Sequence, residues 1–262
     1  MISIVIVSLN TKNDFELSLK SIIKQTYKNY EIIVVDGKSS DGTIDTILKY
    51  KKFFKKTIIE KDKGIYHAMN KGINFISSGW TIFLNSGDVF LNKNTLKKIS
   101  YYLNKKKNID VLVGNTIIKK NNYYYRHVLK KLDKKSFLSS FSHQATVTKS
   151  YLLKKRNFNL KYKIAADFDF FNFLFNKKKK FYYINNYISI NKSGGLSDEK
   201  RIRVIKEFLL INIKYKKKNN YYLIYVLTLI KIILSQVIKK IIPNKIIDNL
   251  VKLKYRKMIY KI

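Results

Sequence analysis

The feature that most constrains the fold of this chain is a regular alternation, over its first third, of short apolar runs and segments with helical periodicity. Residues 2–7 are almost continuously apolar, and similar runs follow at 31–35, 57–59 and 80–84. Continuous apolar runs are typical of strands that are covered on both faces of a parallel sheet. The alternation therefore predicts an α/β fold with a doubly wound, mostly parallel sheet and right-handed crossovers.

The segments between these runs carry apolar residues at helical spacing. These residues are Phe15, Leu19, Ile22 and Ile23, then Ile44, Ile47 and Leu48, then Ile65, Ala68, Met69 and Gly72. Asn13 and Asp14 are expected to cap the first helix, because short polar side chains accept hydrogen bonds from the free N–H groups of a first turn. Ser40 and Asp41 are expected to cap the second helix. Together with Gly42, they are assigned to structure.

The pattern is looser beyond residue 88. It predicts helices over 94–103 and 164–175, strands at 111–114 and near 181–184, and a glycine-containing loop at 193–197. The composition changes near residue 200. We therefore expect an α/β domain over residues 1–200 and a basic, amphipathic helical extension over residues 201–262.

Two carboxylates come directly at the ends of predicted strands. Asp36 follows the run at 31–35, and Asp88 closes a turn after the run at 80–84. In open α/β sheets, ligands bind in the crevice beyond the carboxyl ends of the strands. A carboxylate there can accept hydrogen bonds from a nucleoside, as expected for Asp36, or hold a metal, as expected for Asp88. The alternative for both residues is a purely structural role in a turn.

The chain is strongly basic, with 54 Lys and Arg residues against 17 Asp and Glu residues and a formal net charge of +37. Only five of these basic residues are Arg, whereas nucleic-acid readers favour the bidentate Arg fork. No DNA- or RNA-binding signature is present, so we expect no nucleic-acid partner. The charge is expected to attract the protein to an anionic membrane surface or to anionic substrates.

Cysteine content and the N-terminal pattern both fit a cytoplasmic location. The chain has no cysteine, so neither disulfides nor thiolate metal sites are expected, as in a reducing cytoplasm. Neither a basic leader nor a cleavage-site pattern precedes the first strand, so we expect no secretory signal peptide.

The predicted extension is basic and contains one long apolar segment. Residues 201–262 hold 16 Lys and Arg residues against Glu207 and Asp248, and Tyr221–Ile238 is apolar apart from Lys231 and a few hydroxyl and amide residues. A spanning helix needs about 20 apolar residues and tolerates a central charge poorly, so this segment is expected to fall just short of a span. A helix lying in the membrane interface is favoured. The alternatives are a helical hairpin packed on the α/β domain or a second subunit, and a true span.

Several strings in the chain resemble glycosyltransferase family 2, whose members are inverting nucleotide-sugar transferases with a GT-A fold. The strings are SIVIVSLN, SLKSIIKQTYKNYEIIVVDGKSSDGT, GIYHAMNKGI, SGGLS, and FLNSGD in place of the usual acidic metal-binding triplet. The resemblance covers residues 1–200 and is strongest to the branch that builds bacterial exopolysaccharide and O-antigen chains. It implies transfer of a sugar from a nucleotide diphosphate, expected to be a UDP-sugar, to a glycan or polyprenyl-linked acceptor. It also implies a peripheral location on the inner face of the cytoplasmic membrane.

The resemblance also implies roles for individual residues. The implied nucleotide-sugar-binding residues are Ser8, Asn10, Asp36, Asp62, Lys63 and Asn70. The first three would lie near the base, and Asp62 and Lys63 near the ribose and diphosphate; a surface amide is the alternative for Asn70. Asp88 would bind Mg2+ or Mn2+, because these hard cations prefer oxygen ligands and one carboxylate with two phosphate oxygens can suffice.

Inversion requires a base that removes a proton from the attacking acceptor hydroxyl. The resemblance assigns this role to Asp167, at the expected start of a late helix, where the helix dipole favours an anion. Asp169 is the neighbouring competitor, and a helix cap is the structural alternative for Asp167. His143 and Gln144 match an HQ pair of similar sequences and are expected to line the donor-sugar or acceptor pocket, with a structural role as an equal alternative.

Two other functions compete with a metal-dependent transferase. A nucleotidyltransferase or other α/β nucleotide enzyme requires a phosphate-cradling glycine motif, and neither GxxxxGK[ST] nor GxGxxG is present. A non-catalytic basic protein that binds nucleic acid or membrane would tolerate replacement of Asp88 and Asp167. The sequence therefore favours the transferase.

Overall fold

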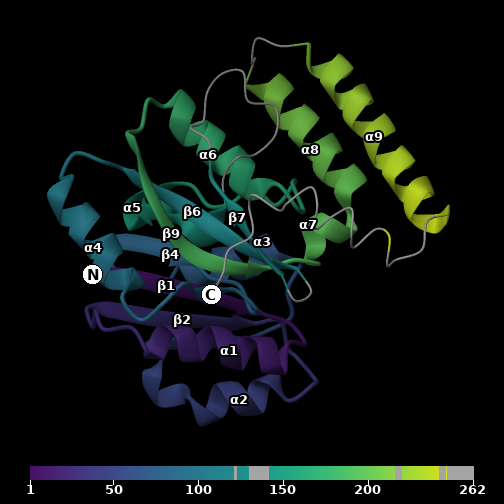
Figure 1. The fold of residues 1–262 in the computed structure, drawn as a ribbon. Helices are drawn as coiled ribbons and strands as arrows, with labels where there is room; N and C mark the ends of the chain where they lie inside the picture. The colour runs from purple at the N-terminus through teal and green to yellow at the C-terminus, as the bar shows by residue number, and fades with distance from the viewer. Residues whose placement is uncertain (121–122, 130–141, 216–219, 242–245, 247–262) are drawn as a thin grey trace.

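One sheet organises the chain, and helices cover both of its faces (Figure 1). The computed structural model describes residues 1–120, 123–129, 142–215, 220–241 and 246. The strands are β1 (Ile2–Ser8), β2 (Tyr30–Asp36), β3 (Lys56–Ile59), β4 (Trp80–Phe83), β5 (Val89–Phe90), β6 (Val111–Lys120), β7 (Tyr123–His127), β8 (Thr146–Lys149) and β9 (Phe181–Lys192). The α-helices are α1 (Lys12–Ile23), α2 (Thr43–Lys49), α3 (Ile65–Ile73), α4 (Thr95–Lys105), α5 (Ser150–Lys155), α6 (Ala166–Asn176), α7 (Leu196–Glu199), α8 (Arg201–Lys214) and α9 (Tyr221–Ile241). Short 3-10 turns, η1 (Lys51–Phe53) and η2 (His143–Ala145), complete the elements.

The first half of the sheet is parallel and the second half is mixed. In the described residues the strand order is β3-β2-β1-β4-β8-β6-β9-β5, with β7 paired to β6. β1 pairs in parallel with β2 and β4, and β2 pairs in parallel with β3. β8 then enters antiparallel between β4 and β6, while β9 runs parallel to β6. The predicted α/β fold is confirmed, but the sheet is not mostly parallel, because four of the eight strand pairings in the described residues are antiparallel. The carboxyl ends of β1 to β4 lie along one edge.

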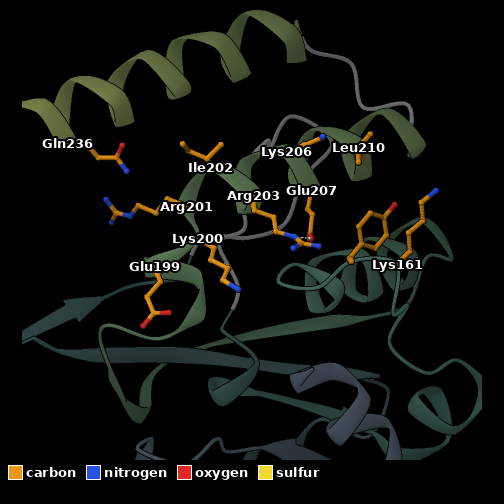
Figure 2. A pocket seen from close by; sticks show the side chains of 11 residues that line it. Lys161, Glu199, Lys200, Arg201, Ile202, Arg203, Lys206, Glu207, Leu210 and Gln236 are labelled. Carbon is orange, nitrogen blue, oxygen red and sulfur yellow. Dashed lines mark hydrogen bonds and ion pairs between the residues drawn. The ribbon is translucent and has the colours of Figure 1, made fainter. Parts of the chain in front are cut away.

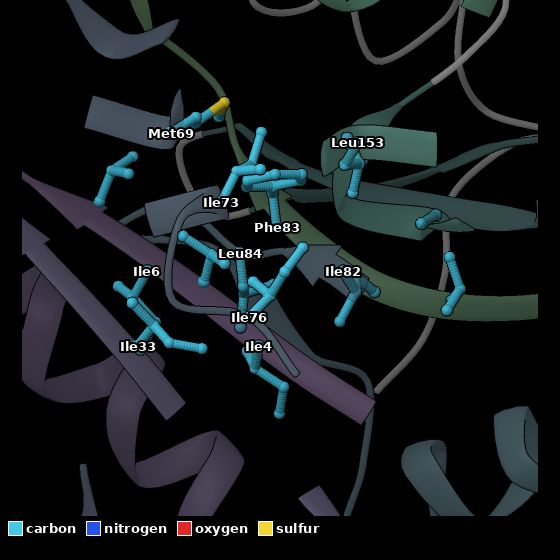
Figure 3. Packing of buried hydrophobic residues seen from close by; sticks show 14 of the residues in the cluster. Ile4, Ile6, Ile33, Met69, Ile73, Ile76, Ile82, Phe83, Leu84 and Leu153 are labelled. Atoms are coloured by element: carbon cyan, nitrogen blue, oxygen red, sulfur yellow. The ribbon is translucent and has the colours of Figure 1, made fainter. Parts of the chain in front are cut away.

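The core forms around the central strands because their side chains are buried on both faces. Every residue of β1 is buried. Figure 3 shows Ile4 of β1 and Ile82 of β4 in one cluster with Met69 of α3 and Leu153 of α5. α3 approaches β1 closely at Gly72, where an added Cβ would lie 2.6 Å from the side chain of Val5. This close packing fixes α3, and the loop before it, against the edge where β1 ends.

The predicted cap of the first helix is wrong. α1 begins at Lys12, so Asn13 and Asp14 lie inside its first turn rather than before it. A tertiary contact sets this start, because the Lys12 N–H donates to Asp41 Oδ2 at 2.9 Å. Asp41 also accepts the Thr43 N–H at 3.0 Å through Oδ1, so its structural assignment is confirmed.

Helices α8 and α9 pack against each other, and among the described residues only α8 also reaches the main core. Ile211 of α8 is fully buried in the main core, whereas Ile205 and Leu209 pack against α9. Within the described residues, α9 is long and apolar enough, by length and composition alone, to cross a membrane; its window Tyr221–Ile238 has a mean hydropathy of 1.8 and is 6% buried. By this criterion, the expectation that the segment falls just short of a span is wrong.

Candidate active site

The ends of β1 and β2 are tied together by a buried carboxylate. Asp36 is fully buried and accepts hydrogen bonds from the hydroxyls of Ser8 and Ser39, both at 2.7 Å, and from the Ser39 N–H at 2.7 Å. The Asn10 N–H in turn donates to Ser39 Oγ at 2.8 Å, and Asn10 Oδ1 accepts the Ser40 N–H at 2.8 Å. Asp36 thus fixes the shape of this loop edge, and Asn10 and Ser40 are the exposed members of the group.

Asp62 joins this edge from the loop after β3. An added Cβ on Gly37 would lie 3.3 Å from Asp62 Oδ2, so Asp62 lies directly beside the end of β2. The Asp62 carboxylate forms ion pairs with Lys71 Nζ at 3.0 Å and, when the ring is protonated, with His67 Nδ1 at 3.3 Å. Lys63 is exposed. The structure therefore brings together four of the predicted nucleotide-binding residues: Ser8, Asn10, Asp36 and Asp62.

Asn70 makes a different contact from the one predicted by resemblance. Its Nδ2 donates to the Phe158 carbonyl at 2.8 Å, and its Oδ1 accepts the Phe158 N–H at 2.9 Å. Both ends of the amide are engaged with a backbone segment 88 residues away in the chain. The contact fixes the segment before α6 against α3, and contact between Asn70 and a nucleotide-sugar stays a prediction.

Asp88 closes the turn that follows β4. Gly87 adopts a φ of +94° there, a conformation that favours glycine. The buried Asp88 carboxylate accepts hydrogen bonds from Gln144 Nε2 at 2.8 Å and from the Lys192 N–H at 3.2 Å. Burial raises the pKa of Asp88 to about 6, more than these hydrogen bonds and the nearby His143 lower it. A buried carboxylate with few partners has acceptor capacity left for a cation.

Asp167, in the first turn of α6, is paired with a histidine. Its Oδ2 lies 3.0 Å from His143 Nδ1, and its Oδ1 accepts the Tyr66 hydroxyl at 2.8 Å. On the other side of the ring, Asn85 Nδ2 lies 2.9 Å from His143 Nε2. An amide N–H that donates to Nε2 leaves the ring proton on Nδ1, where it can donate to Asp167. These partners fix both the ring and the carboxylate.

The environment of Asp167 keeps it anionic. Burial raises the pKa of this carboxyl, but the hydrogen bonds from His143 and Tyr66 outweigh burial and hold the pKa below its usual value. Its side chain is 17% exposed. Oδ1 already accepts two hydrogen bonds, from Tyr66 and from the Phe168 N–H, whereas Oδ2 accepts one. Oδ2 is therefore the oxygen with capacity to take a proton.

Asp169, the competing base, is engaged elsewhere. It is fully buried and forms ion pairs with Arg156 and Lys214, both at 2.7 Å. Lys214 is the last residue of α8, so this carboxylate docks α8 on α6. The geometry favours Asp167 over Asp169 as the base, because Asp167 contacts the cleft-lining residues His143 and Tyr66.

Glu207 of α8 is a supporting residue that the sequence did not reveal. Its carboxylate accepts the N–H groups of Lys163 at 3.0 Å and of Ile164 and Ala165 at 2.9 Å each, immediately before α6. Arg203 Nε donates to the same carboxylate at 3.2 Å. Glu207 thereby fixes the backbone that carries Asp167. Its only sequence signal is an acidic residue in an otherwise basic segment.

A cleft of about 490 Å³ brings the chemistry-bearing side chains together. Asp88, His143 and Gln144 line it, and Asp167 lies directly behind His143 and Tyr66. The neighbouring residues His143 and Gln144 each bind one of the two carboxylates. Ser8, Asn10, Asp36, Asp62, Lys63 and Asn70 are not among the residues that line this cleft.

A divalent cation fits this cleft only if a substrate supplies some of its ligands. Among the described residues, no three His, Cys, Asp or Glu side chains are grouped as a metal site. Asp88 supplies one carboxylate, and the nearby Asn85 Oδ1 is buried without a hydrogen-bond partner. Hard cations accept such oxygens and take further ligands from phosphates. The donor set therefore fits a cation shared with a nucleoside diphosphate.

The fold is similar to that of solved GT-A glycosyltransferase structures. A solved structure of the mannosyltransferase PcManGT from Pyrobaculum calidifontis, in complex with GDP-Man and Mn2+, matches 84% of this chain and 65% of that one, with a TM-score of 0.64 and 14% sequence identity. The family model described as glycosyl transferase family 2 matches residues 3–180. The chain belongs to this family, and it is a nucleotide-sugar-dependent glycosyltransferase.

Curated relatives carry names from glycolipid and polysaccharide synthesis. A PGL/p-HBAD biosynthesis glycosyltransferase of Mycobacterium tuberculosis is 30% identical over 218 residues, which cover 80% of this chain and 82% of that protein. A UDP-Glc:alpha-D-GlcNAc-diphosphoundecaprenol beta-1,3-glucosyltransferase of Escherichia coli is 33% identical over 123 residues, covering 47% of this chain and 48% of that protein. The resemblance seen in the sequence is thus confirmed at the level of the family.

Proposed function

We propose that this protein is a metal-dependent, inverting glycosyltransferase that moves a sugar from a nucleotide diphosphate to a lipid-linked glycan in bacterial surface polysaccharide synthesis. The observation that carries the proposal is the pairing of two carboxylates through adjacent residues. Gln144 holds Asp88, and His143 holds Asp167. A cation-binding carboxylate and a proton-accepting carboxylate are the two groups that such a transfer requires.

Asp167 is the general base in this proposal. The acceptor hydroxyl oxygen forms a bond to the anomeric carbon, from the face opposite the nucleotide, as its proton passes to Asp167 Oδ2. The bond between the anomeric carbon and the phosphate oxygen breaks, and its electron pair leaves with the nucleoside diphosphate. His143 and Tyr66 keep the carboxylate anionic and oriented, and they are positioning residues.

Asp88 would hold Mg2+ or Mn2+ at the diphosphate. A bound cation there neutralises the charge that develops on the leaving nucleoside diphosphate. Asn85, whose Oδ1 lacks a partner, is the second protein oxygen available at this place. The PcManGT structure, which is a complex with GDP-Man and Mn2+, supports the choice of metal.

The donor, acceptor and location rest on relatives and on charge. The relative that uses UDP-Glc and a diphosphoundecaprenol-linked acceptor supports a UDP-sugar donor and a polyprenyl-linked acceptor. Ser8, Asn10, Asp36, Asp62, Lys63 and Asn70 are proposed to bind or shape the nucleotide-sugar site. The exposed apolar face of α9 and the net charge of +37 support peripheral attachment to the inner face of the cytoplasmic membrane.

A transfer assay tests the proposal. Purified protein, Mn2+ and a detergent extract of lipid-linked sugars are incubated in turn with UDP-Glc, UDP-GlcNAc and GDP-Man, and both released nucleoside diphosphate and labelled lipid are measured. We expect one donor to be used, with loss of transfer on chelation and in Asp88→Asn. Full metal-dependent transfer by Asp88→Asn would contradict the metal assignment, and the exposed variant Asp45→Asn is the matched control.

A further inference from the structure

A second cavity, of about 600 Å³, lies at the start of α8 and is strongly basic (Figure 2). Its charged lining consists of Lys161, Lys200, Arg201, Arg203 and Lys206 against Glu199 and Glu207. Glu207 is already occupied by three backbone N–H groups and Arg203. The cavity therefore concentrates positive charge with little internal compensation.

Most of these cations have no acidic partner in the part of the chain that the structure describes. Lys161, Lys200 and Lys206 form no ion pair there, and Arg201 reaches Asp198 only at 3.9 Å. Cations held in one concavity repel each other unless an anion joins them, so the arrangement favours a bound anion. Phosphate groups suit it best, because Arg and Lys donate to phosphate oxygens in strong, charge-assisted hydrogen bonds.

A third hollow of about 540 Å³ adjoins both the basic cavity and the catalytic cleft. It shares Arg201 and Gln236 with the basic cavity and Ser193 and Gly194 with the cleft. The cavity also reaches the base through protein contacts. Arg203 lines the cavity and binds Glu207, which holds the Ala165 N–H two residues before Asp167. A ligand in the cavity can thus extend to the site of sugar transfer.

Helix α9 forms one wall of this third hollow, and the other face of α9 is apolar and exposed. Ile232, Ser235 and Gln236 line the hollow. The exposed apolar side chains are Tyr222, Leu223, Val226, Leu227, Ile230, Ile233, Leu234, Val237 and Ile238. If that face lies in a bilayer, the basic cavity is held at the level of the lipid phosphates, which is where a lipid-anchored diphosphate sits.

We propose that the basic cavity binds the diphosphate of the lipid-linked acceptor, with the lipid chain following α9 and the acceptor sugar reaching the cleft. This assignment rests on the proposed function. Lys200, Arg201 and Lys206 supply direct contacts to the phosphate oxygens. Arg203 contacts the phosphates from its place on Glu207, so an occupied cavity also stabilises the backbone that carries Asp167.

Binding of farnesyl diphosphate to the full chain tests this site without requiring turnover. Calorimetry is done in detergent with saturating UDP and Mn2+, so that the nucleotide site is filled. The double variant Lys200→Ala, Lys206→Ala is expected to bind at least about tenfold more weakly, because two charge-assisted phosphate contacts are lost. The matched control is Lys97→Ala, Lys98→Ala on α4, which removes two exposed lysines elsewhere and is expected to bind as the wild type does.

The outcomes separate this site from its alternatives. Wild-type affinity in the Lys200 and Lys206 double variant, with an unchanged unfolding temperature, would overturn the assignment. Equal competition by phosphatidylglycerol in the same detergent would also overturn it, because the cavity would then serve bilayer headgroups. Asp88→Asn is expected to retain farnesyl diphosphate binding. Absence of sugar transfer in every donor trial, with this binding intact, would contradict the proposed function and leave the phosphate site standing.

Discussion

Helices α8 and α9 follow each other in the chain, yet they make different kinds of contact. α8 buries Glu207 beneath the start of α6 and supplies Lys214 to the buried Asp169. α9 packs on α8 through a small cluster and leaves its apolar face exposed. The first helix is therefore a supporting part of the catalytic domain, and the second is a surface element. The division into domains at residue 200 stays a prediction.

The largest effect is expected at the residue that α8 supports. Asp167→Asn should lower kcat by about 10²–10⁴-fold, because a general base contributes about that much. Donor affinity should stay within about twofold of the wild type, since Asp167 binds His143 and Tyr66 rather than Asp88. Steady-state kinetics with the donor that the transfer assay identifies give both values. A variant with wild-type kcat would show that another group is the base.

A large but smaller effect is expected from α8 itself. Glu207→Ala leaves three backbone N–H groups without their acceptor, which should cost about 3 kcal/mol of unfolding free energy and lower kcat at least about tenfold. Glu207→Gln retains one acceptor oxygen and should lose less of both. Urea unfolding and kinetics measure the two effects. Asp45→Ala, at an exposed acidic residue of α2, is the control, and equal behaviour of Asp45→Ala and Glu207→Ala would refute the role of α8.

Replacement of the buried Asp88 should stabilise the protein, whereas replacement of Glu207 should destabilise it. The pKa of Asp88 is raised from 3.8 to about 6, so the folded state binds more protons than the unfolded state between these values. Stability is then lost as pH rises through this window, and the loss is complete above it. Metal-free Asp88→Asn should therefore be more stable than the wild type at pH 7.5, by up to ~3 kcal/mol. The two should converge near pH 4 in thermal melts.

The pH-dependent difference in stability should be specific to the buried Asp88. Asp45→Asn, at an exposed position, is the matched control variant. Equal stability of wild type and Asp88→Asn at both pH values would mean that burial does not disfavour the charged form of Asp88. A matched melt with Mn2+ and UDP should restore the advantage of the wild type, because a ligand that binds only the folded state stabilises it.

The smallest effect on folding is expected on α9. Leu227 is 56% exposed, so Leu227→Ser should change the unfolding free energy by less than ~0.5 kcal/mol. If α9 lies in the membrane interface, the same change should weaken binding to anionic vesicles about tenfold, the cost of removing one apolar side chain from lipid. Leu48→Ser on α2 is the matched control, with 55% exposure. Equal vesicle binding by the two variants would contradict the placement of α9 in the membrane interface.

The parts of the fold that the sequence predicted are those with strong local patterns. β1 to β4 and the helices between them were readable because buried parallel strands are continuously apolar and their helices are amphipathic. β5 has two residues and β8 four, too few for a period, and β7 lies in a tyrosine-rich stretch without alternation. β6 and β9 extend well beyond the short strands expected at 111–114 and 181–184.

From the sequence, only those site residues that lie in recognisable motifs could be predicted. Asp88 and Asp167 were singled out, but nothing local joins them, since their link runs through His143 and Gln144 on a separate turn. The Glu207 contact crosses 42 residues to Ala165, and no periodicity encodes such a tertiary hydrogen bond. The start of α1 was misplaced for the same reason, because a contact with Asp41 sets it.

The most direct test of a cation shared between Asp88 and the nucleotide is a calorimetric titration of the wild-type protein with UDP, GDP, dTDP and CMP, with and without Mn2+, alongside Asp88→Asn. Asp167→Asn serves as the variant that keeps the cation-binding carboxylate. We predict Mn2+-dependent binding of one nucleotide to the wild type and to Asp167→Asn, and its loss in Asp88→Asn. Equal nucleotide binding with and without Mn2+, unchanged in Asp88→Asn, would contradict a shared cation at the cleft.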